Sequence, residues 1–263
     1  MHAGTVTVSG GRLETGWWGP GPADAPTLVL LHEGLGCVAL WRDVPARLAA
    51  ATGCGVFAYS RFGYGGSDTT ALPRPMSYLH DEALVVLPEV LLASGIRQAV
   101  LIGHSDGGSI AAIHAGSSVV YPQLLGLITI AAHFMVEELN IVSIRQIKAE
   151  YETGGLRQRL GRYHRDVDAA FRGWNDAWLD PRFQGFDITG ILPNIRVPIL
   201  ALQGADDPYG SDVQIRVLAA QARAPVTTEL IAGAGHAPHL EAAGETLAAI
   251  TDFIATIPRG FST

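Results

Sequence analysis

The sequence predicts an α/β fold in which a mostly parallel, doubly wound sheet carries helices on both faces. Short aliphatic and β-branched runs alternate with longer amphipathic stretches, which is typical of βαβ units. The aliphatic runs are continuous, as expected for strands that are buried on both faces. With 263 residues, of which 48% are hydrophobic, the chain is long enough to bury the core of one such domain.

The strands are expected at apolar runs that are followed by glycine turns. The first run, Thr27–Leu31, lies between Pro26 and Gly34. Further strands are expected at Val56–Tyr59, Ala99–Ile102, Leu124–Ala131, Ile199–Leu202 and Val226–Ile231. Helices are expected near Leu40–Ala50, Tyr78–Ala93, Gly108–Ala115, Val213–Ala222 and Glu241–Ile257. Ligands of such sheets bind at the carboxyl ends of the strands.

Residues 133–190 break the alternation. They contain no convincing strand, but several helix-like stretches rich in Arg, Tyr and Trp, such as ELNIVSIRQIKAEY and AAFRGWNDAWL. Because this segment interrupts the alternation between two clear strands, we expect a helical insertion over the edge of the sheet. We call this insertion the cap. Residues 1–132 and 191–263 then form the core.

Composition excludes several classes of function. The formal charge is −7 and no dense basic block is present, so nucleic acid is not expected as a partner. No stretch approaches the ~20 apolar residues that cross a bilayer, and the N-terminus has no basic start, so we expect a cytoplasmic protein without a membrane partner. Cys37 and Cys54 lack metal-ligand spacing and are expected as small buried residues. The expected partner is a small-molecule substrate, and a homodimer is compatible with these features.

The stretch Leu31-His32-Glu33-Gly34-Leu35-Gly36 begins like the helix of a zinc protease. A zinc site of that kind needs a second histidine three residues after the glutamate. Position 36 is glycine, so the zinc interpretation fails. The stretch is instead predicted to be a turn at the end of a buried strand.

A second motif, Gly103-His104-Ser105-Asp106-Gly107-Gly108, follows the expected strand Ala99–Ile102 and opens a helix. A serine on so sharp a turn has a strained backbone, and glycines at 103 and 107 remove collisions with side chains. The motif resembles the nucleophile elbow of the α/β-hydrolase superfamily. The chain order is similar to that family from about residue 25 to 257, which implies an α/β-hydrolase fold with Ser105 as the nucleophile.

The resemblance implies that an acid and then a histidine follow the serine in the chain. His236, in GAGHAPHLE, matches the histidine loop of the family, and His239 is the alternative. A zinc pair formed by these two histidines is not favoured, because Pro238 prevents a regular helix between them.

The acid is expected at Asp207, in the stretch QGADDP. In the family the acid typically stands three residues after the glycine that ends the strand, and Gly204 selects Asp207. Asp206 is the alternative, and its other interpretation is a turn residue bonded to its own backbone.

The same resemblance places the oxyanion hole at the backbone N–H groups of Gly34 and Asp106. Here Glu33 stands where the family usually has glycine. We expect Glu33 to tie down the oxyanion loop, with its carboxylate turned away from the anion and bonded to loop N–H groups or to an arginine of the cap; the alternative is a protonated side chain. The available cap arginines are Arg145, Arg157, Arg159, Arg162 and Arg165.

Two further groups of residues are assigned less specific roles. The stretch YSRFGYGGSD resembles a structural turn of the family, in which Arg61 and Asp68 are expected to be paired or solvated. A phosphate-binding loop is excluded there, because position 68 is not glycine. Candidates for the substrate pocket, with cap packing as the alternative, are His133, Tyr163, His164, Trp174 and Trp178.

We therefore expect a hydrolase that cleaves an ester, thioester or lactone of a small to medium carboxylic acid, with no cofactor and no metal. One alternative is carbon–carbon bond hydrolysis of the meta-cleavage type by the same triad. The other is a non-catalytic ligand receptor on the same scaffold.

Overall fold

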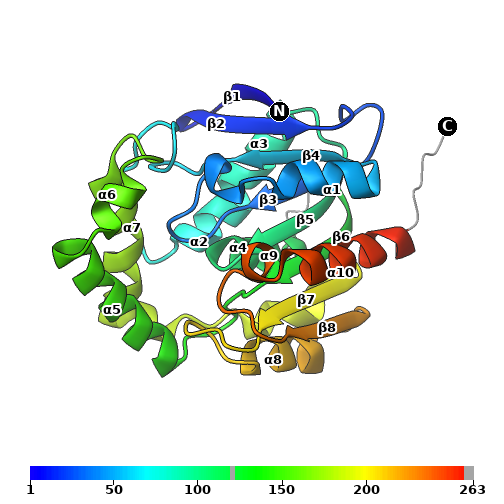
Figure 1. Ribbon diagram of the computed structural model, residues 1–263. Coiled ribbons are helices and arrows are strands. Elements are labelled where there is room, and N and C mark those ends of the chain that lie inside the picture. The colour runs from blue at the N-terminus through cyan, green and yellow to red at the C-terminus, as the bar shows by residue number, and fades with distance from the viewer. Residues whose placement is uncertain (119–121, 258–263) are drawn as a thin grey trace.

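A computed structural model describes residues 1–118 and 122–257 (Figure 1). Within these residues, one sheet has the strand order β1-β2-β4-β3-β5-β6-β7-β8. The hairpin of β1 (His2–Val8) and β2 (Gly11–Trp18) joins the sheet antiparallel to β4. The remaining strands all run parallel: β3 (Thr27–Leu31), β4 (Gly55–Tyr59), β5 (Gln98–His104), β6 (Gln123–Ile130), β7 (Ile199–Gly204) and β8 (Val226–Ile231).

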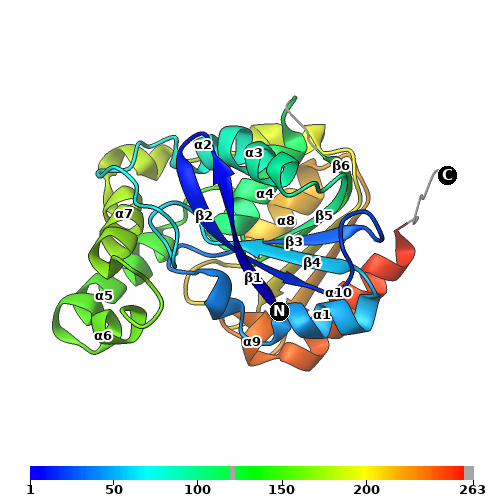
Figure 2. The same ribbon diagram turned by 90° about the horizontal axis from the view of Figure 1, so that it is seen from above.

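Helices cover both faces of this sheet, as Figure 2 shows. On one face lie α1 (Val44–Thr52) and α10 (Ala243–Thr256), and beside α10 the short α9 (Pro238–Glu241). On the other face lie α2 (Tyr78–Asp81), the π-helical turn η2 (Glu82–Val86), α3 (Leu87–Ala93), α4 (Asp106–Gly116) and α8 (Val213–Gln221).

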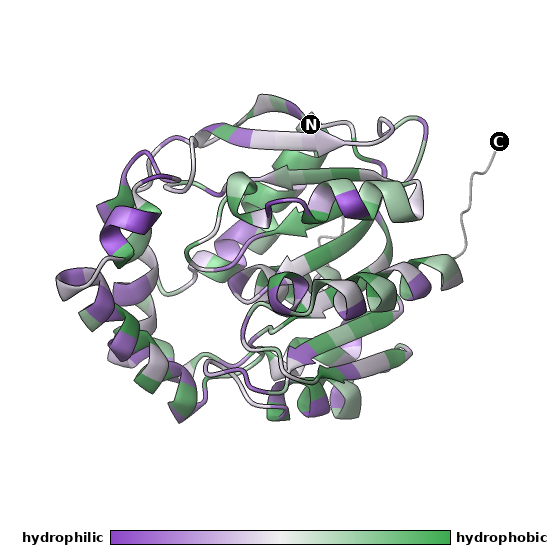
Figure 3. Ribbon diagram, viewed as in Figure 1, coloured by the Kyte–Doolittle hydropathy of each residue, from purple (hydrophilic) through white to green (hydrophobic). Residues whose placement is uncertain are grey.

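Alternation along each strand divides the apolar side chains between two separate cores. In β3, Leu28 and Leu30 pack with α1 and α10, whereas Val29 and Leu31 pack with α3 and α4. Successive residues of a strand point to opposite faces, so a continuous apolar run fills both layers. The central strands are accordingly hydrophobic along their length, whereas the helices of the cap mix both kinds of residue (Figure 3).

The predicted fold class is confirmed, and the six predicted strands lie within two residues of their expected ends. The predicted helix Leu40–Ala50 is wrong in one respect, because it is two elements, η1 (Val38–Trp41) and α1. Between them Arg42 has a φ of 54°, which a continuous right-handed helix cannot contain. Both cysteines are free and buried, as expected.

The cap consists of helices inserted between β6 and β7. They are α5 (Glu138–Thr153), α6 (Leu156–Leu160) and α7 (Val167–Leu179), followed by the 3-10 turns η3 (Pro181–Gly185) and η4 (Thr189–Asn194). Figure 1 shows α5, α6 and α7 beside the sheet and its covering helices. Residues 119–121 and 258–263, which the predicted core includes, lie outside the described residues. No helix in the described chain has an apolar stretch long enough to cross a bilayer.

Candidate active site

Ser105 occupies the tight turn between β5 and α4. Its backbone has φ 52° and ψ −119°, a positive φ that non-glycine residues seldom adopt. A Cβ atom on Gly103 would lie 2.1 Å from the carbonyl oxygen of Gly107, and one on Gly107 would lie 2.0 Å from that of Leu31. The turn can therefore form only with glycine on both sides of the serine, and it presents the serine hydroxyl at the N-terminus of α4.

Ser105, His236 and Asp207 form one hydrogen-bonded chain. The hydroxyl oxygen of Ser105 lies 3.0 Å from His236 Nε2. On the other side of the ring, His236 Nδ1 lies 3.0 and 2.9 Å from the two carboxylate oxygens of Asp207. Because a carboxylate only accepts hydrogen bonds, Nδ1 carries the ring proton, and Nε2 is left to accept from the serine hydroxyl.

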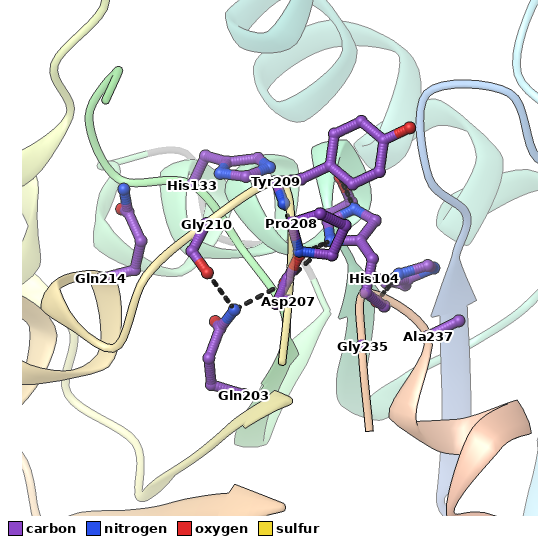
Figure 4. A network of polar contacts seen from close by, with 12 residues as sticks. His104, His133, Gln203, Asp207, Pro208, Tyr209, Gly210, Gln214, Gly235 and Ala237 are labelled. Atoms are coloured by element: carbon purple, nitrogen blue, oxygen red, sulfur yellow. Dashed lines mark hydrogen bonds and ion pairs between the residues drawn. The ribbon is translucent and has the colours of Figure 1, made fainter. Parts of the chain in front are cut away.

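The loop after β7 fixes the orientation of Asp207, as Figure 4 shows. The side chain of Gln203 donates to one carboxylate oxygen at 2.6 Å, and the backbone N–H of Tyr209 donates to the other at 2.7 Å. Burial alone raises the pKa of Asp207, but the hydrogen bonds from His236 and Tyr209 outweigh it and hold this pKa below its usual value. The carboxylate therefore stays ionised beside the imidazole.

The two alternatives that the sequence left open lie elsewhere. Asp206 is exposed, and no hydrogen bond joins its side chain to His236. His239 is buried, with its ring 5.1 Å from that of Trp41 and 4.6 Å from that of His104. Burial holds the pKa of His239 well below its usual value, so the ring is neutral. His239 thus packs against Trp41 and His104, and the histidine that is hydrogen-bonded to Ser105 is His236.

The peptide group that joins Glu33 to Gly34 is held in place by hydrogen bonds to its carbonyl oxygen. The carbonyl oxygen of Glu33 accepts from His32 Nδ1 at 2.7 Å, from Arg61 Nη2 at 2.8 Å and from the N–H of Gly36 at 3.1 Å. The N–H of Gly34, at the other end of the same planar unit, has no partner within the described chain. Its direction is therefore fixed by the bonds to the carbonyl.

Arg61 connects this loop to the elbow, a role that the sequence analysis did not assign to it. Arg61 is buried, and its guanidinium lies 3.6 Å from the carboxylate of Asp106, which is fully buried. That carboxylate also accepts from Tyr78 Oη at 2.9 Å and from Trp178 Nε1 at 3.1 Å. One arginine thus contacts both residues whose N–H groups were predicted to form the oxyanion hole, Asp106 directly and Gly34 through its peptide unit.

The signal for Arg61 was its place in the chain. It lies just beyond the end of β4, which pairs with β3, and loops that follow neighbouring parallel strands meet at one edge of the sheet. Asp68, the other charged residue of that motif, lies near Arg12 and Arg165, at 3.9 and 3.7 Å.

The carboxylate of Glu33 lies beside a histidine and not beside the cap arginine that was one of its two expected partners. Its Oε2 lies 3.4 Å from Nδ1 of His104, and no cap arginine pairs with it among the described residues. The side chain is 29% exposed and borders the cavity above Ser105. Two of the cap arginines instead pair within the cap, Arg157 with Asp168 and Arg159 with Glu150, and Arg165 pairs with Asp68 of the core. Arg157 and Arg159 are exposed on the cap and therefore meet acids of the cap itself.

A cavity of about 120 Å³ lies between the elbow and the cap. Its lining includes three large aromatic rings, those of Trp174, Trp178 and Tyr209. The other residues that line it are Glu33, Gly34, Leu35, Ser105, Asp106, His133, Ile144 and His236. Most of the exposed area inside it is apolar, so the cavity suits a small, largely apolar group.

Of the predicted pocket residues, His133, Trp174 and Trp178 line the cavity, and Tyr163 does not. The side chain of Tyr163 is 41% exposed, because it follows the short helix α6 on the outer surface of the cap. His164 is buried and fastens the cap to the core. Its Nε2 donates to the carbonyl of Leu35 at 3.0 Å, and its Nδ1 accepts from the N–H of Gly65 at 3.0 Å.

His133 contributes a neutral ring to the cavity. Burial, assisted by the charge of His236, lowers the pKa of His133 to about 3. The ring stacks on that of His236 with their centroids 5.8 Å apart, and it meets Trp178 edge-on at 5.3 Å. His133 therefore adds aromatic surface to the wall rather than charge.

Several solved structures share this fold at low sequence identity. An esterase from Exiguobacterium antarcticum is 18% identical with a TM-score of 0.76, covering 97% of this chain and 100% of that chain. An esterase from Rhodococcus sp. is 20% identical with a TM-score of 0.74, covering 98% and 100%. A protein described as an N-acyl homoserine lactone degrading enzyme is 20% identical with a TM-score of 0.73, covering 95% and 100%.

A comparison with curated protein sequences found no match. The model of a protein family described as the alpha/beta hydrolase family matches residues 28–250, which include the elbow, the loop of Asp207 and the loop of His236. The chain therefore belongs to the alpha/beta hydrolase family.

Proposed function

We propose that this hydrolase is a serine esterase that cleaves esters of small, uncharged or cationic carboxylic acids and alcohols through an acyl-enzyme intermediate. The observation that carries the proposal is the hydrogen-bonded chain from Ser105 through His236 to Asp207, which borders a small, mostly apolar cavity. A nucleophile, its base and the group that orients the base are all within hydrogen-bonding distance.

In the first half-reaction, Ser105 Oγ attacks the ester carbonyl while His236 Nε2 takes the hydroxyl proton. Asp207 keeps the ring in the tautomer that can accept this proton and stabilises the imidazolium that forms. The developing oxyanion accepts hydrogen bonds from the N–H groups of Gly34 and Asp106. His236 then passes the proton to the leaving alcohol as the ester bond breaks.

In the second half-reaction, water replaces the alcohol. His236 takes a proton from the water as its oxygen attacks the acyl carbonyl, and the same two N–H groups stabilise the second oxyanion. Collapse of this intermediate releases the carboxylic acid and returns the proton to Ser105 Oγ. No step needs a group that the chain does not supply.

The charges around the cavity weigh against carbon–carbon hydrolysis of meta-cleavage products. Those substrates are dienoates with a carboxylate, which a pocket would bind with arginine, lysine or several donors. The described lining has neither cation, and it includes the carboxylate of Glu33. An anionic substrate would be repelled there. The strained backbone of Ser105 argues against a purely binding role, because a receptor would gain nothing from that strain.

The test is hydrolysis of p-nitrophenyl acetate and butyrate by the wild type and by Ser105→Ala. We expect turnover by the wild type and a loss of at least ~10³-fold in the variant, because the triad acts as a unit. Ser77→Ala, which removes an exposed hydroxyl of the α2 N-terminus, is the matched control. An unchanged rate in Ser105→Ala would remove the mechanism. A wild type that cleaves dienoates but no ester would favour the carbon–carbon alternative.

A further inference from the structure

We propose that the carboxylate of Glu33 binds a positively charged ammonium group of the substrate, so that the preferred substrates are cationic esters. The inference rests on the proposed esterase function and extends it to the class of substrate. It is carried by the position of one carboxylate at the edge of a cavity whose walls are aromatic.

The position of this carboxylate is built into the loop. Gly36 leaves the space that it occupies, because a Cβ atom there would lie 2.3 Å from Oε2 of Glu33. In this position the side chain of Glu33 is 29% exposed and borders the same cavity as Ser105. The carboxylate of Asp106, the other acid in the lining, is fully buried and bonded to Tyr78 and Trp178. Of these two acids, only Glu33 can meet a ligand.

The protein leaves this carboxylate charged and without a cationic side chain of arginine or lysine. Within the described residues its one ion-pair partner is His104, whose Nδ1 is 3.4 Å away. Burial acts to raise the pKa of Glu33, but the interaction with His104 holds it well below its usual range. A substrate thus meets an ionised acid.

Aromatic side chains line the same cavity as Glu33. The indole of Trp174 lies directly on the neighbouring residue, since a Cβ atom on Gly34 would come within 2.1 Å of its Nε1. Trp178 and Tyr209 line the same cavity. Faces of aromatic rings attract ammonium groups, and an aromatic cage with one acid is the arrangement that binds alkylated ammonium ions. A small cavity of about 120 Å³ suits a compact cation.

The position of Glu33 also affects the chemical step. It adjoins Gly34, whose N–H faces the developing oxyanion, and an ionised carboxylate at this point disfavours a second negative charge. An ammonium group bound to Glu33 cancels that repulsion. A cationic substrate should therefore gain in kcat as well as in KM, whereas a neutral ester is cleaved against the repulsion.

The experiment compares esters with their neutral carbon isosteres. If the ammonium group lies in the alcohol, the pair is 2-(trimethylammonio)ethyl acetate and 3,3-dimethylbutyl acetate. If it lies in the acyl group, the pair is p-nitrophenyl 4-(trimethylammonio)butyrate and p-nitrophenyl 5,5-dimethylhexanoate. Each kcat/KM is divided by the rate of alkaline hydrolysis of the same ester. For at least one pair we expect the wild type to prefer the cationic ester by about 10-fold or more.

The variants are Glu33→Gln and, as the charge-matched control, Asp176→Asn. Asp176 lies on α7, like Trp174, and its side chain is 54% exposed near Lys148. We expect Glu33→Gln to reduce the preference toward one and Asp176→Asn to leave it unchanged. Using the ratio of two substrates removes any general loss of activity in a variant. A wild-type ratio of one or less for both pairs, or a ratio that Glu33→Gln does not alter, would overturn the inference.

A binding measurement keeps the inference testable if Glu33→Gln does not fold or no ester is turned over. Calorimetry of the wild type should give choline an affinity at least about 10-fold above that of 3,3-dimethylbutan-1-ol. Equal affinities would contradict the cation site. Hydrolysis of neutral esters without any preference would remove the cation site alone, whereas absence of all ester hydrolysis would remove the proposed esterase function.

Discussion

Replacing Arg61 with methionine should reduce both the stability of the fold and the rate of the reaction, for two separable reasons. The guanidinium lies 3.6 Å from the fully buried carboxylate of Asp106. At an effective dielectric constant of about 20, two unit charges at this distance attract one another by about 5 kcal/mol. Removing one partner of a buried pair typically costs about 3–5 kcal/mol of unfolding free energy. We expect that loss for Arg61→Met.

The double variant Arg61→Met/Asp106→Asn separates charge from position. It removes both charges, so most of the lost stability should return, because no unpaired carboxylate remains buried. The hydrogen bond from Arg61 to the carbonyl of Glu33 is absent from both variants. A hydrogen bond from a charged donor contributes about 1.5–3 kcal/mol. Two other donors still hold that carbonyl, His32 and the N–H of Gly36, so kcat should fall by about 10- to 100-fold.

Urea unfolding and saturation kinetics with p-nitrophenyl acetate measure the two effects. The control is Arg74→Met, which removes another buried arginine, one that donates to the carbonyl of Phe62 and not to the oxyanion loop. It should lose stability with a much smaller loss of kcat. If the double variant regained both stability and the full wild-type kcat, Arg61 would have no role in positioning the N–H of Gly34.

Four further variants test other parts of the account. His236→Ala should lower kcat by at least ~10³-fold, and His239→Ala should lower it far less; equal losses would put the base in doubt. Gly103→Ala should abolish or strongly destabilise the fold, because its Cβ would lie 2.1 Å from the carbonyl of Gly107; normal thermal unfolding would contradict this. His133 has a folded pKa of about 3, below its unfolded value of about 6.5, so its contribution is present above pH 6.5 and is lost as the pH falls toward 3. In urea titrations over this range, His133→Gln should lose less stability than the wild type, and parallel curves would refute the assignment.

The strands were predictable because local composition determines them. An apolar run such as Thr27–Leu31 can be buried on both faces only at the centre of a parallel sheet, and neighbouring glycines mark its end. The break between η1 and α1 was not predictable, since it depends on one arginine, Arg42, whose left-handed backbone no sequence pattern signals.

Within the site, residues were predictable where a motif fixes the backbone. Ser105 sits on a turn that only its glycines permit, so its location follows from sequence. The partners of buried charges were not predictable, because they depend on which loops meet in space. The contact of Arg61 with Asp106 joins residues that are far apart in the chain, and that of Glu33 with His104 joins two different loops. The outward position of Tyr163 was missed for a different reason: it follows the short helix α6 on the outer surface of the cap.

Covalent labelling of Ser105 tests the central claim most directly. A fluorophosphonate transfers its phosphonyl group to an activated serine oxygen with loss of fluoride, so the account predicts a single adduct that mass spectrometry locates on Ser105. The same reagent should leave Ser105→Ala and His236→Ala unlabelled under the same conditions, because the first lacks the nucleophile and the second lacks the base that activates it. An adduct on another residue, or a wild type that hydrolyses esters while remaining unlabelled, would contradict the account.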